Sequence, residues 1–244
     1  MILPLILIAA LLAPAQPDAQ PAAPAQSAPA VAPDSLQQKL DALDQKITAI
    51  KDLAADFEQQ KKTALLKKPL TSSGTIRLKG QRTRWDTRTP HPTIMTIDPD
   101  QVCIYYPDQK SQEIYPIRGE MARLASSPLP RISIIREQFD ITEIKPADID
   151  PKADPHANLL ALSLTPKSDT LKQHVQKIRV LIDTDSACAK LVEITDADGD
   201  KTTITFTNIK IDSGLSDHDV EFTPPPGTQV SRPLDAAPPQ GGSK

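Results

Sequence analysis

The side chains that could carry out catalysis are few and lie far apart in this sequence. The four histidines, His91, His156, His174 and His218, fall in turn-like stretches, and none has the spacing of a metal ligand pair. The sequence contains no nucleophile-elbow, phosphate-loop, dinucleotide-binding or H-E-x-x-H motif. We therefore predict that the protein is not an enzyme and that it uses no metal and no cofactor.

Asp196, Asp198 and Asp200 have the spacing with which a calcium-binding loop begins. Such a loop needs an acidic residue at its twelfth position, and Thr207 stands there. Asp198 directly precedes Gly199 between two runs of alternating residues, which is typical of a tight hairpin turn. We interpret this acidic stretch as a hairpin.

The two cysteines, Cys103 and Cys188, leave two alternatives open. In an oxidising compartment they could form a disulfide, provided that their Cα atoms come within bridging distance. Otherwise they are two separate thiols.

The elements that would position a binding site are mostly strands. Between Gly74 and Lys110, apolar residues alternate with polar ones, and turn residues separate the runs. Ile76 and Leu78 should therefore lie on one face of a sheet and Arg77 and Lys79 on the other. Further strands are predicted at residues 159–165, 176–183, 190–196 and 201–212.

Helices are expected in two places. Residues 34–59 are predicted as one amphipathic helix, because apolar residues from Leu36 to Phe57 recur every three or four positions. Residues 120–139 are predicted as two short apolar helical pieces, interrupted at Pro128 and Pro130. Consecutive strands without βαβ alternation predict an α+β fold, mainly β, with a strongly curled antiparallel sheet and helices on one of its faces.

The two ends of the chain differ from its centre. Residues 1–15 combine an apolar run of signal-peptide length with small residues after it, although a buried helix is the alternative. Residues 16–33 are an Ala/Pro-rich stretch expected to be a disordered tether, and residues 233–244 are expected to be a disordered tail. We thus expect a cleaved signal peptide, export to the periplasm and one domain over residues 34–232.

The formal net charge is −3, with basic and acidic residues interspersed, which does not indicate nucleic-acid binding. A small basic cluster begins with lysines 61, 62, 67 and 68 ahead of the first strands and continues with Arg77, Lys79, Arg82, Arg84 and Arg88. This cluster is interpreted either as a solvated surface or as a docking surface for an acidic partner or anionic head groups.

Several short motifs, in order, resemble the periplasmic lipoprotein carriers of the LolA family over residues 35–232. They are D-F-E-Q at 56–59, S-G-T-I at 73–76, R-W-D at 84–86, V-C-I-Y-Y-P at 102–107, S-P-L at 127–129, L-S-L-T-P-K at 162–167, G-D-K-T at 199–202 and F-T-P-P-P-G-T-Q-V at 222–230.

The resemblance implies an unclosed antiparallel β-barrel lidded by α-helices, whose cavity takes lipoprotein acyl chains from an inner-membrane ABC transporter towards an outer-membrane acceptor. A monomer is expected. The arginine that latches the lid in the family has no clean counterpart here, and Arg82 or Arg84 is the expected substitute. Strand parity predicts that nine residues line the cavity, namely Ile76, Leu78, Trp85, Ile104, Tyr106, Ile178, Val180, Ile182 and Phe206. The lid should add Leu124, Leu129, Ile132 and Ile135.

Two functions from different classes remain at this point. One is a carrier that binds lipoprotein acyl chains, or other lipids, without chemistry. The other is an interaction or sensing module on the same fold that binds a segment of a partner protein. An open apolar space would favour the first, and a solidly packed core the second.

Overall fold

The computed structural model describes residues 35–116 and 129–233. Within these ranges the chain forms one 12-stranded sheet with helices on one side. The strands are β1 (Asp52–Lys62), β2 (Leu70–Lys79), β3 (Arg82–Thr89), β4 (Thr93–Ile97), β5 (Gln101–Tyr106), β6 (Ser111–Pro116), β7 (Phe139–Ile144), β8 (Leu159–Pro166), β9 (Val175–Asp183), β10 (Cys188–Asp196), β11 (Lys201–Ile211) and β12 (Gln229–Ser231). The α-helices are α2 (Ser35–Ala49), α3 (Ile132–Gln138) and α4 (Asp169–Lys172).

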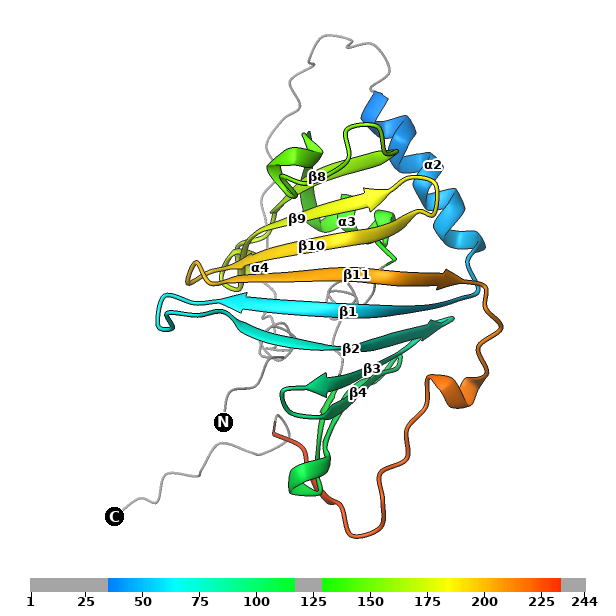
Figure 1. Cartoon of the computed structure of the whole chain (residues 1–244), viewed down its shortest axis with the longest axis vertical. Helices are drawn as coiled ribbons and strands as arrows, with labels where there is room; N and C mark the ends of the chain where they lie inside the picture. Colours follow the sequence, from blue (N-terminus) through cyan, green and yellow to red (C-terminus); the bar gives the residue numbers. More distant parts are fainter. Residues whose placement is uncertain (1–34, 117–128, 234–244) are drawn as a thin grey trace, which may run out of the picture.

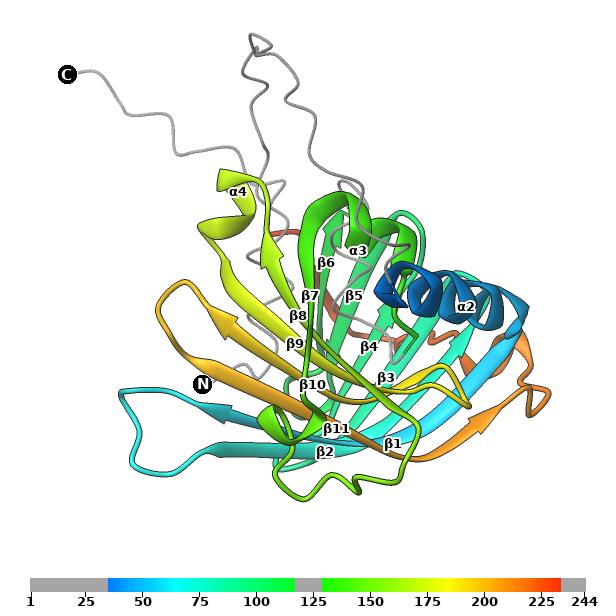
Figure 2. The ribbon, with the colours of Figure 1, turned by 90° about the horizontal axis from the view of Figure 1, so that it is seen from above.

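The sheet is strongly curled and its two edges do not meet (Figures 1 and 2). Its strand order is β12-β6-β5-β4-β3-β2-β1-β11-β10-β9-β8-β7, so β12 and β7 are the edges. Every neighbouring pair is antiparallel except β12 and β6, which run parallel. The predicted fold class, a mainly β, unclosed antiparallel barrel, is confirmed.

Long-range pairing joins the two halves of the sheet. Strand β1 pairs with its chain neighbour β2 on one side and with β11, about 150 residues later, on the other. Phe57 stands opposite Gly74 in β2 and opposite Phe206 in β11. This junction makes one continuous surface from two segments that are distant in the sequence.

The predicted helix over residues 34–59 is wrong in its second half. Helix α2 ends at Ala49, and Leu53 and Phe57 lie in strand β1 instead. A spacing of four places two residues on the same face of a helix and also of a strand. The burial of Leu53, Ala55, Phe57 and Gln59, every second residue, shows that period two applies here.

The second half of the sheet agrees with the sequence prediction. The four expected strands correspond to β8, β9, β10 and β11, and Asp198-Gly199 forms the β10–β11 turn. Gly199 has a φ of +85°, and its N–H donates to the Asp196 carbonyl at 3.0 Å. Strand β7 is not predicted by the sequence, because Phe139 continues the apolar pattern of the preceding helical segment.

The helices α2 and α3 lie on the concave side of the sheet, as Figure 2 shows. The chain leaves the sheet at β6, beside one edge strand, and re-enters it at β7, the opposite edge. The described part of the connection between them contains α3, which packs on the concave face. In residues 35–116 and 129–233, no helix is long and apolar enough to cross a membrane.

The C-terminal part of the chain crosses the outer side of the sheet. After β11, residues 212–228 run past β2 and β3, with a short 3-10 turn at Asp217–Asp219, and end in β12 beside β6. The expected signal peptide (1–15), the tether (16–33), the helical turn at 120–125 with Leu124, and the tail from residue 234 lie outside the described residues.

Candidate functional site

The concave face of the sheet is the surface on which the predicted site residues meet. In its first half, Ile76 stands opposite Trp85, Trp85 opposite Met95, and Met95 opposite Ile104. Residues directly opposite in an antiparallel sheet point to the same side. These side chains therefore form a row across four strands, and Leu78 lies on the same side two residues along β2 from Ile76.

The second half of the sheet continues this face. Val180 stands opposite Val192 in β10 and opposite Leu162 in β8, and Ile178 and Ile182 flank it at period two. All nine residues expected on the cavity wall share the concave face, whether they belong to the first or the second half.

Three aromatic rings fill the centre of the face, where the two halves join. The ring centroids of Phe57 and Trp85 are 4.7 Å apart in an edge-on arrangement, and those of Trp85 and Phe206 are 6.1 Å apart. The rings fit because Gly74 has no side chain. A Cβ at this position would lie 2.0 Å from the Asp86 carbonyl oxygen and 2.9 Å from the Phe57 ring.

Two helices cover most of the face. From α3 and the residues before it, Leu129, Ile132 and Ile135 are buried in the same core as the concave residues. From α2, Leu40 and Leu43 are each only 2% exposed. The lid residues expected from the sequence, apart from Leu124, thus pack directly on the concave face.

Polar contacts at the surface hold the two helices together. Arg136 of α3 donates to Asp41 of α2 at 2.6 Å, and Lys167 donates to the Arg136 carbonyl at 2.7 Å. Lys39 of α2 reaches Glu143 of edge strand β7, also at 2.6 Å. These contacts link α2, α3 and one edge of the sheet.

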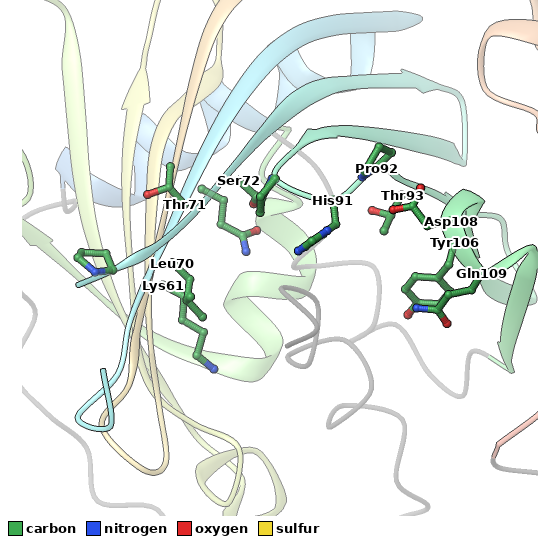
Figure 3. A pocket seen from close by; sticks show the side chains of 13 residues that line it. Lys61, Leu70, Thr71, Ser72, His91, Pro92, Thr93, Tyr106, Asp108 and Gln109 are labelled. Atoms are coloured by element: carbon green, nitrogen blue, oxygen red, sulfur yellow. The ribbon is translucent and has the colours of Figure 1, made fainter. Parts of the chain in front are cut away.

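A cavity of about 510 Å³ opens at one end of the half-barrel (Figure 3). Among the expected cavity residues, only Tyr106 lines it. The other lining residues are Gln59, Lys61, Pro69, Leu70, Thr71, Ser72, Pro90, His91, Pro92, Thr93, Asp108 and Gln109. Three of these residues, Gln59, Ser72 and Thr93, lie on the concave side of their strands. Because their side chains are polar, the search for alternating apolar residues could not predict them as part of a binding site.

A second, much smaller cavity of about 50 Å³ lies beneath α3. Ile135, Phe139, Leu164, Ile178 and Val180 are among its lining residues. The remaining expected wall residues, Ile76, Leu78, Trp85, Ile104, Ile182 and Phe206, are buried in the core. Most of the concave face is therefore filled by the lid.

One carboxylate lies on the concave face near the larger cavity. Glu113 of β6, opposite Ile104, accepts hydrogen bonds from the hydroxyls of Tyr106 at 3.1 Å and Tyr115 at 2.9 Å. Burial raises the pKa of Tyr115 to about 12, with the hydrogen bond to Glu113 as the next cause. Burial and the Glu113 charge also raise the pKa of Tyr106.

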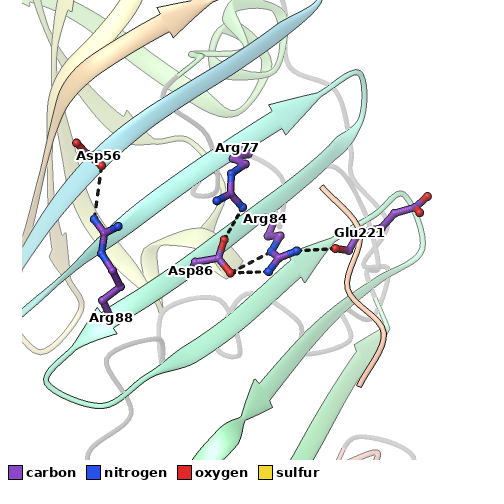
Figure 4. Close-up of polar contacts among 6 residues, drawn as sticks. All are labelled: Asp56, Arg77, Arg84, Asp86, Arg88 and Glu221. Carbon is purple, nitrogen blue, oxygen red and sulfur yellow. Dashed lines mark hydrogen bonds and ion pairs between the residues drawn. The ribbon is translucent and has the colours of Figure 1, made fainter. Parts of the chain in front are cut away.

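The expected lid latch at Arg82 or Arg84 is wrong. Both residues alternate with Trp85 and therefore point to the outer face, away from the helices. Arg82 pairs with Glu221. Arg84 donates to the Asp86 carboxylate and to the Glu221 carbonyl, as Figure 4 shows. Both arginines thus hold the C-terminal segment against the sheet.

The disulfide alternative is also wrong. Cys103 and Cys188 are buried free thiols on β5 and β10, and strands β4, β3, β2, β1 and β11 lie between them in the sheet. Burial raises the pKa of Cys188 to about 11 and also raises the pKa of Cys103. Across residues 35–116 and 129–233, His, Cys, Asp and Glu side chains form no cluster that could hold a metal ion.

A curled, open sheet with an apolar concave face under two helices defines a class of lidded half-barrel proteins. Residues 48–223 match the family model of the outer membrane lipoprotein carrier protein LolA. The chain belongs to this family.

Individual relatives agree with this assignment. An outer-membrane lipoprotein carrier protein of Xanthomonas oryzae pv. oryzae is 29% identical over 192 residues, covering 77% of this chain and 85% of the relative. The protein of the same name from Xanthomonas campestris pv. campestris is 30% identical over 190 residues, with the same coverage. A conserved uncharacterized protein of Thermus thermophilus shares the fold, with a TM-score of 0.52 at 12% identity, over 82% of this chain and 99% of that protein.

Proposed function

We propose that this protein is a periplasmic carrier that binds the acyl chains of lipoproteins, or other lipids, on its concave face and moves them towards the outer membrane. It performs no chemistry. Membership of the lipoprotein carrier family supports this proposal, together with one structural observation. The continuous apolar face is covered by short helices of the same chain, rather than by a second sheet.

Acyl chains suit such a face because their binding needs no directional partner. Burial of apolar surface contributes about 25 cal/mol per Å², whichever aliphatic side chains supply the wall. Ile132 and Ile135 of the lid occupy the positions that an acyl chain would take. Entry of a chain therefore requires α3 to withdraw. The open cavity at one end of the half-barrel, which we call the rim cavity, would be the point of entry, and its volume lies within the usual range of about 300–1,000 Å³ for ligand sites.

The wider role follows from the family. A carrier of this kind would take its cargo from an inner-membrane ABC transporter and pass it to an acceptor at the outer membrane. Residues 1–15 would serve as the cleaved signal peptide, 16–33 as a tether, 34–232 as the binding domain and 233–244 as a tail. The nine concave residues and Leu124, Leu129, Ile132 and Ile135 would contact the cargo.

A second candidate is an interaction or sensing module that binds a partner protein segment. One observation favours it, because the space beneath α3 is only about 50 Å³. In this alternative the lid would stay in place as permanent core, and the rim cavity would receive the partner.

Native mass spectrometry of protein isolated from the periplasm of its own host distinguishes the two. The carrier proposal expects a fraction of molecules with lipid or lipoprotein mass, and lipid extraction should recover acyl chains. Repeated isolation of lipid-free protein would contradict the proposal and favour the second candidate.

Neighbouring serines supply a matched pair of variants. Ser72 is buried on the concave side and lines the cavity, whereas Ser73 faces the other way and bonds to Thr89 at 2.8 Å. We expect Ser72→Trp to fill the cavity and to lower lipid occupancy several-fold. Ser73→Trp should leave occupancy unchanged, and equal occupancy in both variants would exclude the cavity as the entry point.

A further inference from the structure

The loop between β1 and β2 exposes apolar surface that the rest of the fold does not use. We define this leucine loop as residues 63–69. Leu65 is 91% exposed and Leu66 is 39% exposed, and Val230 is the other large exposed hydrophobic residue in the described ranges. Leaving a leucine in water forgoes about 1.5–3 kcal/mol relative to burying it.

Local hydrogen bonds hold the leucines in this outward position. The Thr63 hydroxyl accepts from the Leu65 N–H at 3.2 Å, and the Thr63 carbonyl accepts from the Leu66 N–H at 3.3 Å. The chain is thus turned at Thr63 so that both leucines stand at the tip of the hairpin. Both side chains are available to an external apolar phase without any change in the sheet.

Lysines surround the tip. Lys62, Lys67 and Lys68 are exposed and form no ion pair with any carboxylate in the part of the chain that the structure describes. Lys61, by contrast, lies 3.8 Å from Asp196 and 3.6 Å from Asp200 of the adjacent β10–β11 turn. Lys61 thereby neutralises part of the acidic charge beside the loop, and the three free lysines give the tip a positive surface.

The loop also occupies a defined place relative to the cavity. The β1–β2 hairpin, cyan in Figures 1 and 2, extends beyond the body of the sheet at one end. Lys61, Pro69 and Leu70, at the base of the loop, line the cavity of about 510 Å³. Whatever binds the tip is therefore brought next to the cavity.

We propose that the leucine loop docks on the surface of an anionic bilayer, with Leu65 and Leu66 inserted at the acyl boundary and Lys62, Lys67 and Lys68 against the lipid head groups. Each lysine near an anionic surface contributes about 1 kcal/mol, and the two leucines add apolar burial. The tip fits a bilayer better than a protein. Two leucines on a narrow turn supply far less than the roughly 800 Å² that each partner buries in a stable protein interface.

This docking goes beyond the proposed carriage of lipid and does not depend on it. It would hold the mouth of the cavity against a membrane, where lipid enters or leaves. Vesicle binding through the loop and lipid uptake on the concave face are separate events, and each can be measured without the other.

The test is flotation of the exported chain with phosphatidylglycerol-containing vesicles and with pure phosphatidylcholine vesicles. We expect the protein to float with the anionic vesicles at low salt and less as salt rises, because screening weakens the lysine contacts. The double variant L65S/L66S should bind about tenfold more weakly or worse, and K62Q/K67Q/K68Q should lose the preference for anionic lipid.

Val230→Ser is the matched control, since it removes an exposed apolar side chain on β12, which four strands of the sheet separate from β2. It should bind vesicles like the unmodified protein. Because all of these positions are exposed, the thermal melting temperature of each variant should stay unchanged, which verifies folding. A Leu65→Trp variant adds a fluorescence readout, since the emission should shift to the blue on anionic vesicles while Trp85, which is buried, reports the core.

Three outcomes would overturn the proposal. One is absence of flotation with anionic vesicles, and another is equal binding by the unmodified protein and L65S/L66S. The third is an unshifted Leu65→Trp emission with vesicles but a shift with a periplasmic protein fraction, which would assign the loop to a protein partner. Lipid extracted into a soluble complex stays out of the floated fraction, so failure of docking and failure of lipid carriage are distinguishable.

Discussion

Arg136 of helix α3 donates a hydrogen bond from Nη2 to Oδ1 of Asp41 in helix α2 at 2.6 Å. The pair ties the lid helix, which carries Ile132 and Ile135 into the core, to the longer helix beside it. The side chains are 30% and 51% exposed, so the pair contributes less than about 1 kcal/mol. A contact that contributes so little free energy favours the packed position of α3 but can be broken easily.

Removal of this pair should loosen the lid. We expect Asp41→Asn to raise amide hydrogen exchange in residues 132–138 by about two- to fivefold, the equivalent of up to about 1 kcal/mol. Asp44→Asn is the control, because Asp44 lies on the same helix and accepts only from Thr48 through its carbonyl group. A faster rate in both variants, or in neither, would show that the pair does not hold the lid.

The lid should also exchange faster than the sheet in the unmodified protein. We expect the amides of α3 to be less protected than those of β1 and β11, because in the proposed carrier α3 must move before the concave face can take a ligand. Addition of lipid should change exchange in this segment and leave the central strands unchanged. Strong protection of lid and strands alike, with and without lipid, would mean that the helices are permanent core.

Gly74 should tolerate no side chain. In Gly74→Ala the new Cβ would meet the Asp86 backbone at 2.0 Å, which neither strand can relieve by a rotamer change, so we expect a loss of about 3 kcal/mol or more in the free energy of unfolding. Gly80→Ala is the comparison, since no atom lies within 4 Å of its Cβ and only its φ of +57° is unfavourable. It should cost about 1–2 kcal/mol in urea denaturation, and equal losses would contradict the packing argument.

The outer arginines should affect the C-terminal segment and not the lid. Phe222 packs 5.1 Å from the Tyr105 ring, and the Arg84 guanidinium lies 5.6 Å from the Phe222 centroid. We expect Arg84→Ala to speed proteolytic cleavage within residues 212–228 several-fold. Arg88→Ala, on the same strand but paired with Asp56, should not, and lid exchange should be unchanged in both. If amide exchange in the lid were faster in Arg84→Ala alone, Arg84 would after all hold the lid, as the sequence predicted.

The buried thiols should be unreactive in the folded protein. The pKa of Cys188 is about 11 after burial, so its thiolate is scarce at pH 8, and a thiol reagent should modify neither cysteine until the chain is denatured. A thiol whose pKa is higher in the folded than in the unfolded chain loses its proton more readily after unfolding. The contribution of Cys188 to the free energy of unfolding is therefore complete below about pH 9 and is lost as the pH rises through 11. Alkaline melting curves that stay flat from pH 8 to 11 would contradict this.

The sequence alone determined which residues share a face of each strand. Alternation at period two depends only on backbone geometry, so Ile76, Trp85, Ile104 and Val180 could be assigned to one side before any contact was known. The Asp198-Gly199 turn and the four strands of the second half were predictable for the same reason, since turn chemistry and alternation are local properties.

Local pattern failed where one spacing fits two structures. Leu53 and Phe57 are four residues apart, which suits a helix and a strand equally, and pairing with β11 decided for the strand. The alternation that places Trp85 on the concave face also places Arg84 on the outer face, away from the lid. The segment that Arg84 contacts lies about 140 residues later in the chain, so the local sequence pattern could not predict this contact.

Only the tertiary structure decided what covers the apolar face and where space remains. Helix α3 lies between β6 and β7 in the chain and packs on the concave face, and the strand order that puts β6 and β7 towards opposite edges of the sheet is not a local property. The larger cavity is lined by prolines, Leu70 and Tyr106 together with Gln59, Ser72 and Thr93, and the types of these last three carry no signal of a binding site. Side-chain direction is local, but burial, cavities and exposed tips such as Leu65 depend on which distant segments pack together.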